Sequence, residues 1–302
     1  MTIRFDGRVA IVTGAGNGLG RSHALGLAAR GAKVVVNDLG GARDGTGGSS
    51  EAALKVVEEI RAAGGEAIAN GANVADETAV AAMVAEAMAK WGRVDILVAN
   101  AGILRDKTFA KMDMADFRAV IDVHLMGSAI CAKAVWEIMR QQNYGRIVFT
   151  SSSSGLYGNF GQANYGAAKA AMVGLMNVLH LEGDKFNIRV NTLAPTAATR
   201  MTEELMPPQS LALLRPETIT PGVLYLIGED APSRVILDAG AGCFARTYVL
   251  ETQGVTLLDA DLTPEKVAEN FAAISESAPQ ALPNAFAQTE KFVRAAMKAR
   301  SV

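Results

Sequence analysis

The stretch that decides the fold is residues 8–30, RVAIVTGAGNGLGRSHALGLAAR, near the start of the 302-residue chain. Residues 8–13 contain the β-branched run VAIVT, which predicts a short buried strand. Four glycines follow between positions 14 and 20, and residues 21–30 have the composition of a helix that ends at Gly31. A strand, a glycine turn and a helix in this order predict a phosphate-binding turn. Glycines let the backbone approach a pyrophosphate, and the helix N-terminus supplies free N–H groups.

Taken alone, this glycine turn is weak evidence. Its spacing is TGxxxGxG rather than the commoner GxGxxG fingerprint, and a tight turn that only brings helix close to sheet would look the same. Its position between the first strand and the first helix favours the phosphate-binding interpretation. The residues predicted to bind the pyrophosphate are Gly14, Asn17, Gly18, Leu19 and Gly20.

The chain after this stretch alternates between strand-like and helix-like runs. Strands are expected at 33–37, 66–70, 95–99, 146–150, 188–193 and 233–237, and helices at 51–63, 76–91, 113–140, 164–186, 217–228 and 284–300. This alternation predicts an α/β fold: a Rossmann-type, doubly wound parallel sheet of about seven strands with helices on both faces. We expect residues 1–240 to form this catalytic domain and residues 241–302 to be an extension packed on it.

Several residues that follow the predicted strands favour a dinucleotide. Asp38 ends the second strand, where an acid can bond both ribose hydroxyls of an adenosine and repel a 2′-phosphate, so we predict NAD rather than NADP. Arg43, in the glycine-rich loop 40–50, is a counter-argument whose position the sequence does not give. The other residues expected along the cofactor are Asn73 and Val74 for the adenine, Asn100, Ala101 and Gly102 for a ribose, and Pro195, Ala197, Ala198 and Thr199 for the nicotinamide.

Residues 150–169, TSSSSGLYGNFGQANYGAAK, gather the groups expected to do chemistry. Tyr165 and Lys169 are four residues apart, which places both side chains on one face of a helix. Ser152 lies thirteen residues before Tyr165, at the end of a strand-like run. A hydroxyl, a phenol and an ammonium that converge at the mouth of a sheet suit proton transfer to or from a carbonyl or alcohol oxygen.

Composition excludes several other classes of protein. The net charge is −2, so the chain has no electrostatic preference for nucleic acid or for an anionic membrane surface. Its two cysteines are too few for a disulfide framework or a metal site, and neither a signal peptide nor an apolar run of about 20 residues is apparent, which favours a cytoplasmic protein. Residues 201–214 contain two prolines and two methionines, which fits a mobile lid and ordinary helix packing about equally.

These motifs in combination resemble the short-chain dehydrogenase/reductase family. The resemblance rests on Gly14-x-x-x-Gly18-x-Gly20, Asn100-Ala101-Gly102, Ser152, Tyr165-x-x-x-Lys169 and Pro195, and covers residues 8–237. Longer stretches, among them VVVNDLGG, NAGILRDKTFAKM and APTAATRMT, resemble the hydroxyacyl-CoA dehydrogenase domain of the type 2 peroxisomal multifunctional enzymes. The hydratase and sterol-carrier domains and the peroxisomal signal of those enzymes are lacking, so we expect a free-standing bacterial form.

The resemblance implies NAD-dependent oxidation of a 3R-hydroxyacyl-CoA, with a fatty or steroid side chain, to the 3-ketoacyl-CoA. It assigns Tyr165 as general base, with its pKa lowered by Lys169 and the nearby nicotinium charge, and Ser152 as the holder of the substrate oxygen. Lys169 is also expected to bond the nicotinamide ribose. It places His124 where most members have an asparagine that supports a water-linked proton path. A homodimer is implied, with a tetramer as the alternative.

Two other classes of function stay open at this point. The same motifs fit a ketoacyl carrier-protein reductase or a hydroxysteroid dehydrogenase, and a strong preference for NADPH would favour the reductase. A non-catalytic NAD-binding partner belongs to a different class, and its expected mark is loss of the serine, tyrosine or lysine. All three are present here at Ser152, Tyr165 and Lys169.

Overall fold

The computed structural model describes residues 2–197 and 208–300. The strands are β1 Val9–Thr13, β2 Lys33–Asn37, β3 Glu66–Asn70, β4 Ile96–Ala99, β5 Gly145–Thr150, β6 Ile188–Thr196, β7 Ile236–Gly240, β8 Cys243–Thr247, β9 Glu251–Thr252 and β10 Pro279–Gln280. The helices are α1 Gly18–Ala28, α2 Glu51–Ala62, α3 Glu77–Trp91, α4 Met114–Ile121, α5 Gly127–Gln142, α6 Ser153–Tyr157, α7 Ala163–Gly183, α8 Pro208–Leu213, α9 Thr220–Leu226, α10 Pro264–Glu269, α11 Phe271–Glu276 and α12 Ala285–Arg300. Short 3₁₀ turns are η1 Phe109–Lys111, η3 Asp184–Phe186, η5 Pro216–Thr218 and η6 Asp259–Asp261, and η2 Asp122–Met126 is a π-helical turn.

The main sheet confirms the predicted doubly wound architecture. Its order is β3-β2-β1-β4-β5-β6-β7-β8, and neighbouring strands from β3 through β7 pair in parallel. Within the described residues it has eight strands, not the expected seven or so. The eighth follows β7 after the two-residue turn Ala241-Gly242, where both residues have positive φ (51° and 77°), as the two-residue hairpin turn that suits strand twist requires.

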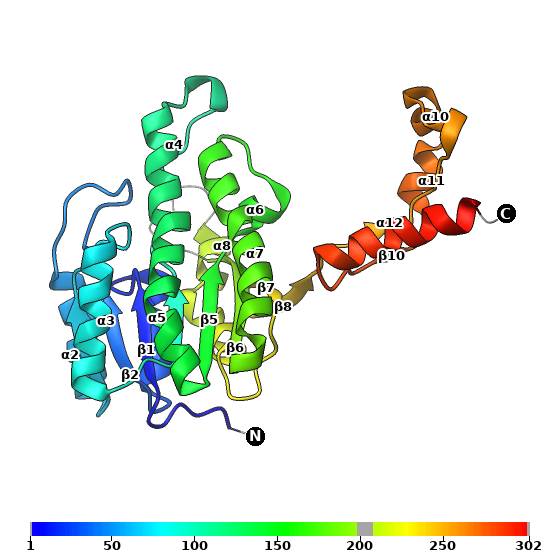
Figure 1. Ribbon diagram of the computed structural model, residues 1–302. Helices are drawn as coiled ribbons and strands as arrows, with labels where there is room; N and C mark the ends of the chain where they lie inside the picture. Colours follow the sequence, from blue (N-terminus) through cyan, green and yellow to red (C-terminus); the bar gives the residue numbers. More distant parts are fainter. Residues whose placement is uncertain (1, 198–207, 301–302) are drawn as a thin grey trace. The chain divides into compact units, whose positions relative to one another are not determined.

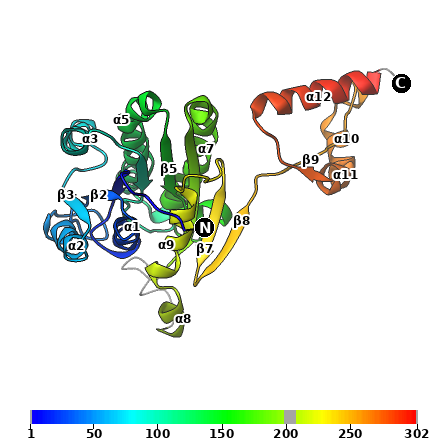
Figure 2. The same ribbon diagram turned by 90° about the horizontal axis from the view of Figure 1, so that it is seen from below.

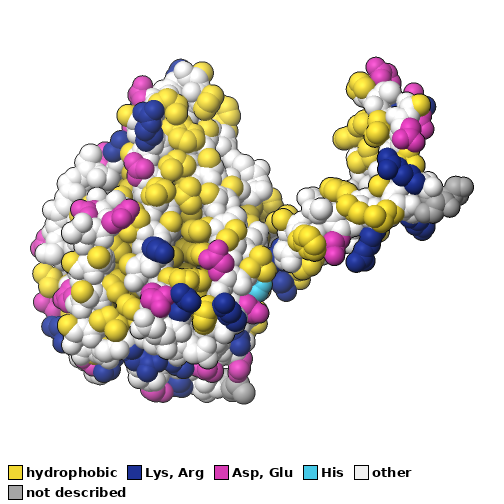
Figure 3. Space-filling model, in the orientation of Figure 1, with side chains coloured by type: hydrophobic (Ala, Val, Ile, Leu, Met, Phe, Trp, Pro, Cys, Tyr) yellow, Lys and Arg dark blue, Asp and Glu magenta, His cyan; other side chains and the backbone are white. Residues whose placement is uncertain are grey.

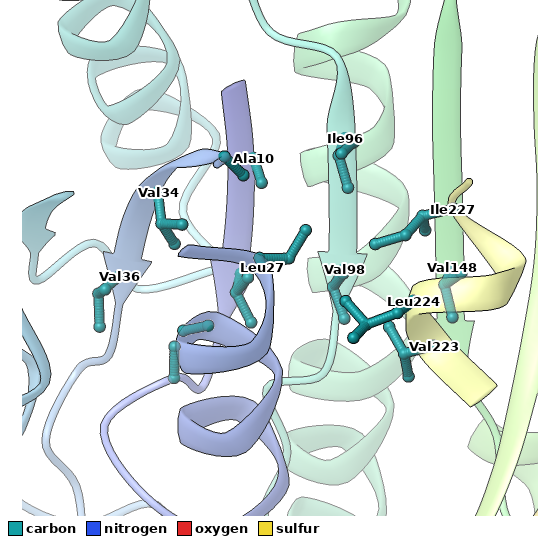
Figure 4. Packing of buried hydrophobic residues seen from close by; sticks show 14 of the residues in the cluster. Ala10, Leu27, Val34, Val36, Ile96, Val98, Val148, Val223, Leu224 and Ile227 are labelled. Atoms are coloured by element: carbon teal, nitrogen blue, oxygen red, sulfur yellow. The ribbon is translucent and has the colours of Figure 1, made fainter. Parts of the chain in front are cut away.

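Hydrophobic side chains cover both faces of this sheet. Alternate residues of each strand point to opposite faces, so Ala10 and Val12 belong to one core cluster and Ile11 to the other. The helices α1, α2 and α9 close the first face, and α3, α5 and α7 close the second (Figure 2). Figure 4 shows Leu27 of α1 and Leu224 of α9 against strand residues of the first cluster. A sheet buried on both faces leaves its strand ends for function.

The long helix expected at 113–140 is interrupted. It runs as α4 and α5 (Figure 1), joined by the π-helical turn η2. His124 lies inside this π turn. A π turn inserts one residue into the α-helical ladder, and sequence periodicity does not reveal it. The three segments together, Met114–Gln142, are long and apolar enough to cross a membrane by length and composition alone. The expectation that no apolar run of this length is present is therefore wrong. In this structure it packs against α3, α7 and β5, as core helices of α/β domains do.

The chain separates into two compact units, Met1–Arg246 and Thr247–Val302. The boundary lies six residues beyond the predicted 240, because β8 joins the main sheet. In the second unit β9 and β10 pair antiparallel, and Thr263 caps α10 by accepting the Lys266 N–H, as Pro264 at the helix start had indicated. That the extension packs on the catalytic domain stays a prediction.

Candidate active site

The glycine turn joins β1 to α1 and brings their ends close together. Gly14 and Gly18 have φ of 62° and 53°, which glycine adopts without strain. A Cβ on Gly14 would lie 2.8 Å from Ala101 Cα, and one on Gly20 would lie 2.1 Å from Gly14 O, so side chains are excluded there. The α1 N-terminus, capped by Asn17 without a side-chain hydrogen bond, therefore has the open N–H groups that bind a phosphate.

Asp38 lies directly beside this turn. Its Oδ2 accepts a hydrogen bond from Gly16 N at 2.7 Å, and its Oδ1 accepts one from Gly40 N at 2.7 Å. Each carboxylate oxygen can accept one more hydrogen bond, so the pair can still receive two ribose hydroxyls. The acid thus ties together the glycine turn, the end of β2 and the start of the glycine-rich loop.

A cavity of about 470 Å³ connects this region with the end of α7 that carries Tyr165. Sequence-predicted residues that line it are Gly14, Asn17, Gly18, Leu19, Asp38, Asn73, Val74, Asn100, Ala101, Gly102, His124, Tyr165 and Lys169. A dinucleotide fits this cavity for two reasons. Any Cβ added at the glycine turn would fill the space for the phosphates, and the two ends of the cavity carry an acid, Asp38, and a buried lysine, Lys169.

The serine run after β5 divides into separate roles. Ser151 Oγ donates to Lys169 O at 2.7 Å, and Ser154 Oγ donates to Gln162 Oε1 at 2.8 Å, while Ser153 is exposed. Ser152 caps α6 and its hydroxyl hydrogen-bonds the phenol of Tyr165. Strand alternation does not relate these serines to one another, because the strand ends at residue 150 and a helix begins at 153.

Tyr165 and Lys169 both lie within the first two turns of α7. Burial raises the pKa of Tyr165, and the Ser152 hydrogen bond lowers it by a smaller amount. Lys169 is 4% exposed, donates from Nζ to Thr150 O at 2.6 Å, and has a pKa lowered by burial to about 7. In the cofactor-free chain desolvation of the phenolate dominates, and the lowering of the Tyr165 pKa by Lys169 together with the nicotinium charge stays a prediction.

His124 faces Tyr165 from the π turn. Its Nε2 lies 2.8 Å from Ile103 O, and its Nδ1 is buried with no hydrogen-bond partner among the described residues. Burial, with the nearby Lys169 as second cause, lowers the pKa of His124 well below its ordinary value, so the ring is neutral. Nε2 also lies 3.1 Å from Ile103 N, but the shorter contact favours the tautomer in which Nε2 donates to the carbonyl, and that tautomer leaves Nδ1 as an acceptor.

The remaining predicted residues lie elsewhere or outside the described part of the chain. Gly20, Ser152, Pro195 and Ala197 do not line the cavity as the described residues define it. Ala198, Thr199 and residues 201–207 of the proposed lid at 201–214 fall outside the described residues. In the part of the chain that the structure describes, no group of three His, Cys, Asp or Glu side chains is placed to hold a metal ion.

Sequence reasoning missed three contributors to the site. Thr13 Oγ1 accepts the backbone N–H groups of Asn100 and Ala101, each at 3.0 Å, which joins the ends of β1 and β4. The loop after β2 reaches the cavity through residues 41–45, and Arg43 O accepts Leu104 N at 3.0 Å. A third contributor is the carboxylate of Asp106, which raises the pKa of Tyr165. No local pattern marks these residues, because each acts through a partner distant in sequence.

Comparison with known proteins identifies the class. The family model described as short chain dehydrogenase matches residues 8–210, and the chain belongs to the short-chain dehydrogenase/reductase family of oxidoreductases, whose members use NAD(P). The chain is 47% identical to peroxisomal multifunctional enzyme A of Dictyostelium discoideum over 99% of its own length and 67% of that protein. It is 49% identical to a short-chain type dehydrogenase/reductase of Mycobacterium tuberculosis over 89% of this chain and 94% of that one.

Solved structures agree with this family. Full-length peroxisomal multifunctional enzyme type 2 from Drosophila melanogaster matches with a TM-score of 0.83 and 38% identity, over 98% of this chain and 50% of that chain. The chain therefore spans about half the length of that enzyme. A 7α-hydroxysteroid dehydrogenase in complex with NADH and 7-oxo glycochenodeoxycholic acid matches with a TM-score of 0.71 and 32% identity, over 79% of this chain and 95% of that chain.

Proposed function

We propose that this oxidoreductase converts a 3R-hydroxyacyl-CoA to the 3-ketoacyl-CoA with NAD. The observation that carries the proposal is the placement of Tyr165 and Lys169 at one end of a cavity whose other end holds the glycine turn and Asp38, with Ser152 acting on the Tyr165 phenol. The relatives named as multifunctional enzymes support an acyl-CoA rather than a free alcohol. A fatty or a steroid side chain fits equally.

The proposed chemistry uses groups at their observed positions. When bound, the nicotinamide ring supplies the acceptor for the hydride from C3 of the substrate. Tyr165 accepts the hydroxyl proton, and Ser152 holds the same oxygen through a hydrogen bond that orients it toward the phenol. Lys169, released from Thr150 O, would hold the ribose hydroxyls beside the ring.

His124 is proposed to continue the proton path from the site. Its ring meets that of Tyr165 edge to face, with centroids 5.2 Å apart. The buried, unpaired Nδ1 can accept a hydrogen bond from a water that also contacts Lys169, whose charge acts on His124. The histidine thus offers a side-chain acceptor for the water-linked path that the family resemblance implies.

We further propose a homodimer. None of the described residues of the second unit is buried, although Phe271, Phe286, Phe292 and Met297 are among its large apolar side chains. Such a unit lacks a core of its own and gains stability by covering another surface. On the first unit, Figure 3 shows hydrophobic side chains over the face formed by α5 and α7, where Val178 and Leu181 are exposed. Sedimentation at several concentrations tests the dimer against a monomer or tetramer.

A cytoplasmic location is also proposed. Cys131 is buried and Cys243 is exposed, and the structure pairs neither in a disulfide, which fits a reducing compartment. Fractionation of the source cells would test this directly, and recovery in a secreted or membrane fraction would contradict it.

The decisive experiment follows NADH formation over 3-hydroxyacyl thioesters of both hands, with short, long and steroid-linked chains. We expect turnover of the 3R series and little of the 3S series. A Tyr165→Phe variant should lose about 10²- to 10⁴-fold in kcat while NADH binding is kept. Activity only on free hydroxysteroids, or only in the NADPH-dependent reducing direction on a carrier-protein substrate, would overturn the assignment. Binding of NADH without any turnover would indicate a non-catalytic partner.

A further inference from the structure

A hydrogen-bonded group near Tyr165 has no part in the reaction described above. Asp106 lies between β4 and α4, and its Oδ2 accepts a hydrogen bond from Gln162 Nε2 at 2.6 Å. The other end of the same amide, Oε1, accepts from Ser154 Oγ at 2.8 Å and from Asn159 Nδ2 at 3.0 Å. Gln162 is 7% exposed, so its hydrogen bonds are shielded from water and stronger for it.

Backbone contacts hold Asp106 in place on both sides. Lys107 N donates to Gly161 O at 3.0 Å, and Lys107 and Gln162 form an isolated β-bridge. On the other side, Arg105 O accepts Asn164 Nδ2 at 2.9 Å. The segment that carries Asp106 is therefore joined directly to the chain that leads into α7.

We propose that Asp106 is a positioning residue of the active site: through Gln162 and Ser154 it holds the turn that carries Ser152. The inference rests on the proposed role of Tyr165 as general base. The connection to Ser152 is complete, because Ser154, which Gln162 holds, donates its backbone N–H to Ser152 Oγ at 3.2 Å.

The surroundings of the phenol explain why this charge matters. Of the described groups that face Tyr165, Ser152 is neutral and His124 is neutral because burial lowers its pKa. Lys169 Nζ lies 5.5 Å from the centroid of the Tyr165 ring. Because the pKa of Lys169 is about 7 and that of Tyr165 is raised, the lysine loses its charge at a lower pH than the phenol loses its proton. The charge of Asp106 raises the pKa of Tyr165, by less than burial does.

The test compares Asp106→Asn and Asp106→Ala in the full chain. Asparagine keeps the acceptor for Gln162 and removes the charge, so kcat at its plateau should change less than about threefold. The pH profile for oxidation should move to lower pH, and the shift should shrink at high salt. Alanine breaks the connection and should lower kcat about tenfold without a matching rise in KM. Asp106 is exposed, so neither change removes core packing.

Asp113→Asn is the matched control, because Asp113 is an exposed carboxylate on the same part of the chain that pairs with Lys107. It should leave the profile unchanged. The pKa of Tyr165 can also be measured without substrate, from the ultraviolet absorbance of tyrosinate as the pH is raised. The absorbance of the same chain with Tyr165→Phe is subtracted, so that only Tyr165 contributes to the difference. An Asp106→Asn profile equal to that of the parent overturns the charge effect, and an Asp106→Ala chain with parental kcat overturns the positioning. Both outcomes leave Tyr165→Phe inactive, whereas failure of the proposed function would leave Tyr165→Phe active.

Discussion

The imidazole of His124 and the phenol of Tyr165 meet edge to face, with ring centroids 5.2 Å apart. The two residues come from different helices, and the contact depends on the π turn that carries the histidine. Ile103 holds the far side of the imidazole through its carbonyl, 2.8 Å from Nε2. The phenol therefore has a neutral, buried ring with one open acceptor as its neighbour.

The first prediction concerns His124 itself. His124→Asn keeps a donor and an acceptor, whereas His124→Leu keeps only bulk, so asparagine should retain most of the turnover and leucine should lose about 10²-fold in kcat. NADH binding, followed by fluorescence, should differ by less than about twofold among the three chains. A leucine variant with parental kcat would remove His124 from the proton path.

The second prediction uses Gly102, which packs against that histidine. A Cβ at position 102 would lie 2.2 Å from His124 Cε1, and the ring is buried and held by Ile103, so it has little room to move. Gly102→Ala should lower both kcat and the free energy of unfolding, the latter by about 1–3 kcal/mol. Gly71→Ala is the control, because no atom lies within 4 Å of its Cβ position. Equal melting temperatures for the two variants would contradict this packing.

The third prediction follows from the buried ammonium of Lys169. Its pKa is about 7 in the folded chain and 10.5 is the ordinary value, so between these pH values the unfolded chain binds more protons and this group makes stability rise with pH. Lys169→Met removes the cost of burying a charged ammonium group. The variant should be more stable than the parent at pH 7, and the difference should shrink toward pH 10. Thermal unfolding of both chains across this range checks the sign, and a difference that grows with pH would refute it.

The fourth prediction concerns Asp38 and the choice of cofactor. Asp38→Asn removes the charge that would repel a 2′-phosphate but keeps an oxygen for one of the two backbone N–H groups, from Gly16 or Gly40. The ratio of kcat/KM for NAD to that for NADP should fall at least about tenfold. Asp44→Asn, in the same loop, is the control, since the Asp44 carboxylate hydrogen-bonds Thr46 within the loop. An unchanged ratio would mean that another group selects the cofactor.

Local patterns were sufficient for most of the fold. β-Branched runs, glycine stops and helix periodicity located the strands at 33–37 and 66–70 to the residue and the third helix to within one residue, because both faces of the sheet are buried. The predictions that failed needed information from elsewhere. The π turn at His124 and the hairpin that adds β8 depend on a small change in backbone geometry within a run of ordinary composition.

The sequence by itself determined the family, the doubly wound sheet, the glycine turn and the candidate set Ser152, Tyr165 and Lys169, because each is recorded in residue type and spacing. Only the tertiary structure decided the electrostatics of that set. Burial raises the pKa of Tyr165 and lowers that of Lys169. The tertiary structure also places Asp106 at the site, where it accepts a hydrogen bond from Gln162, a residue 56 positions away in the sequence. Desolvation and long-range hydrogen bonds depend on what surrounds a side chain, and the linear spacing of residues does not contain that information.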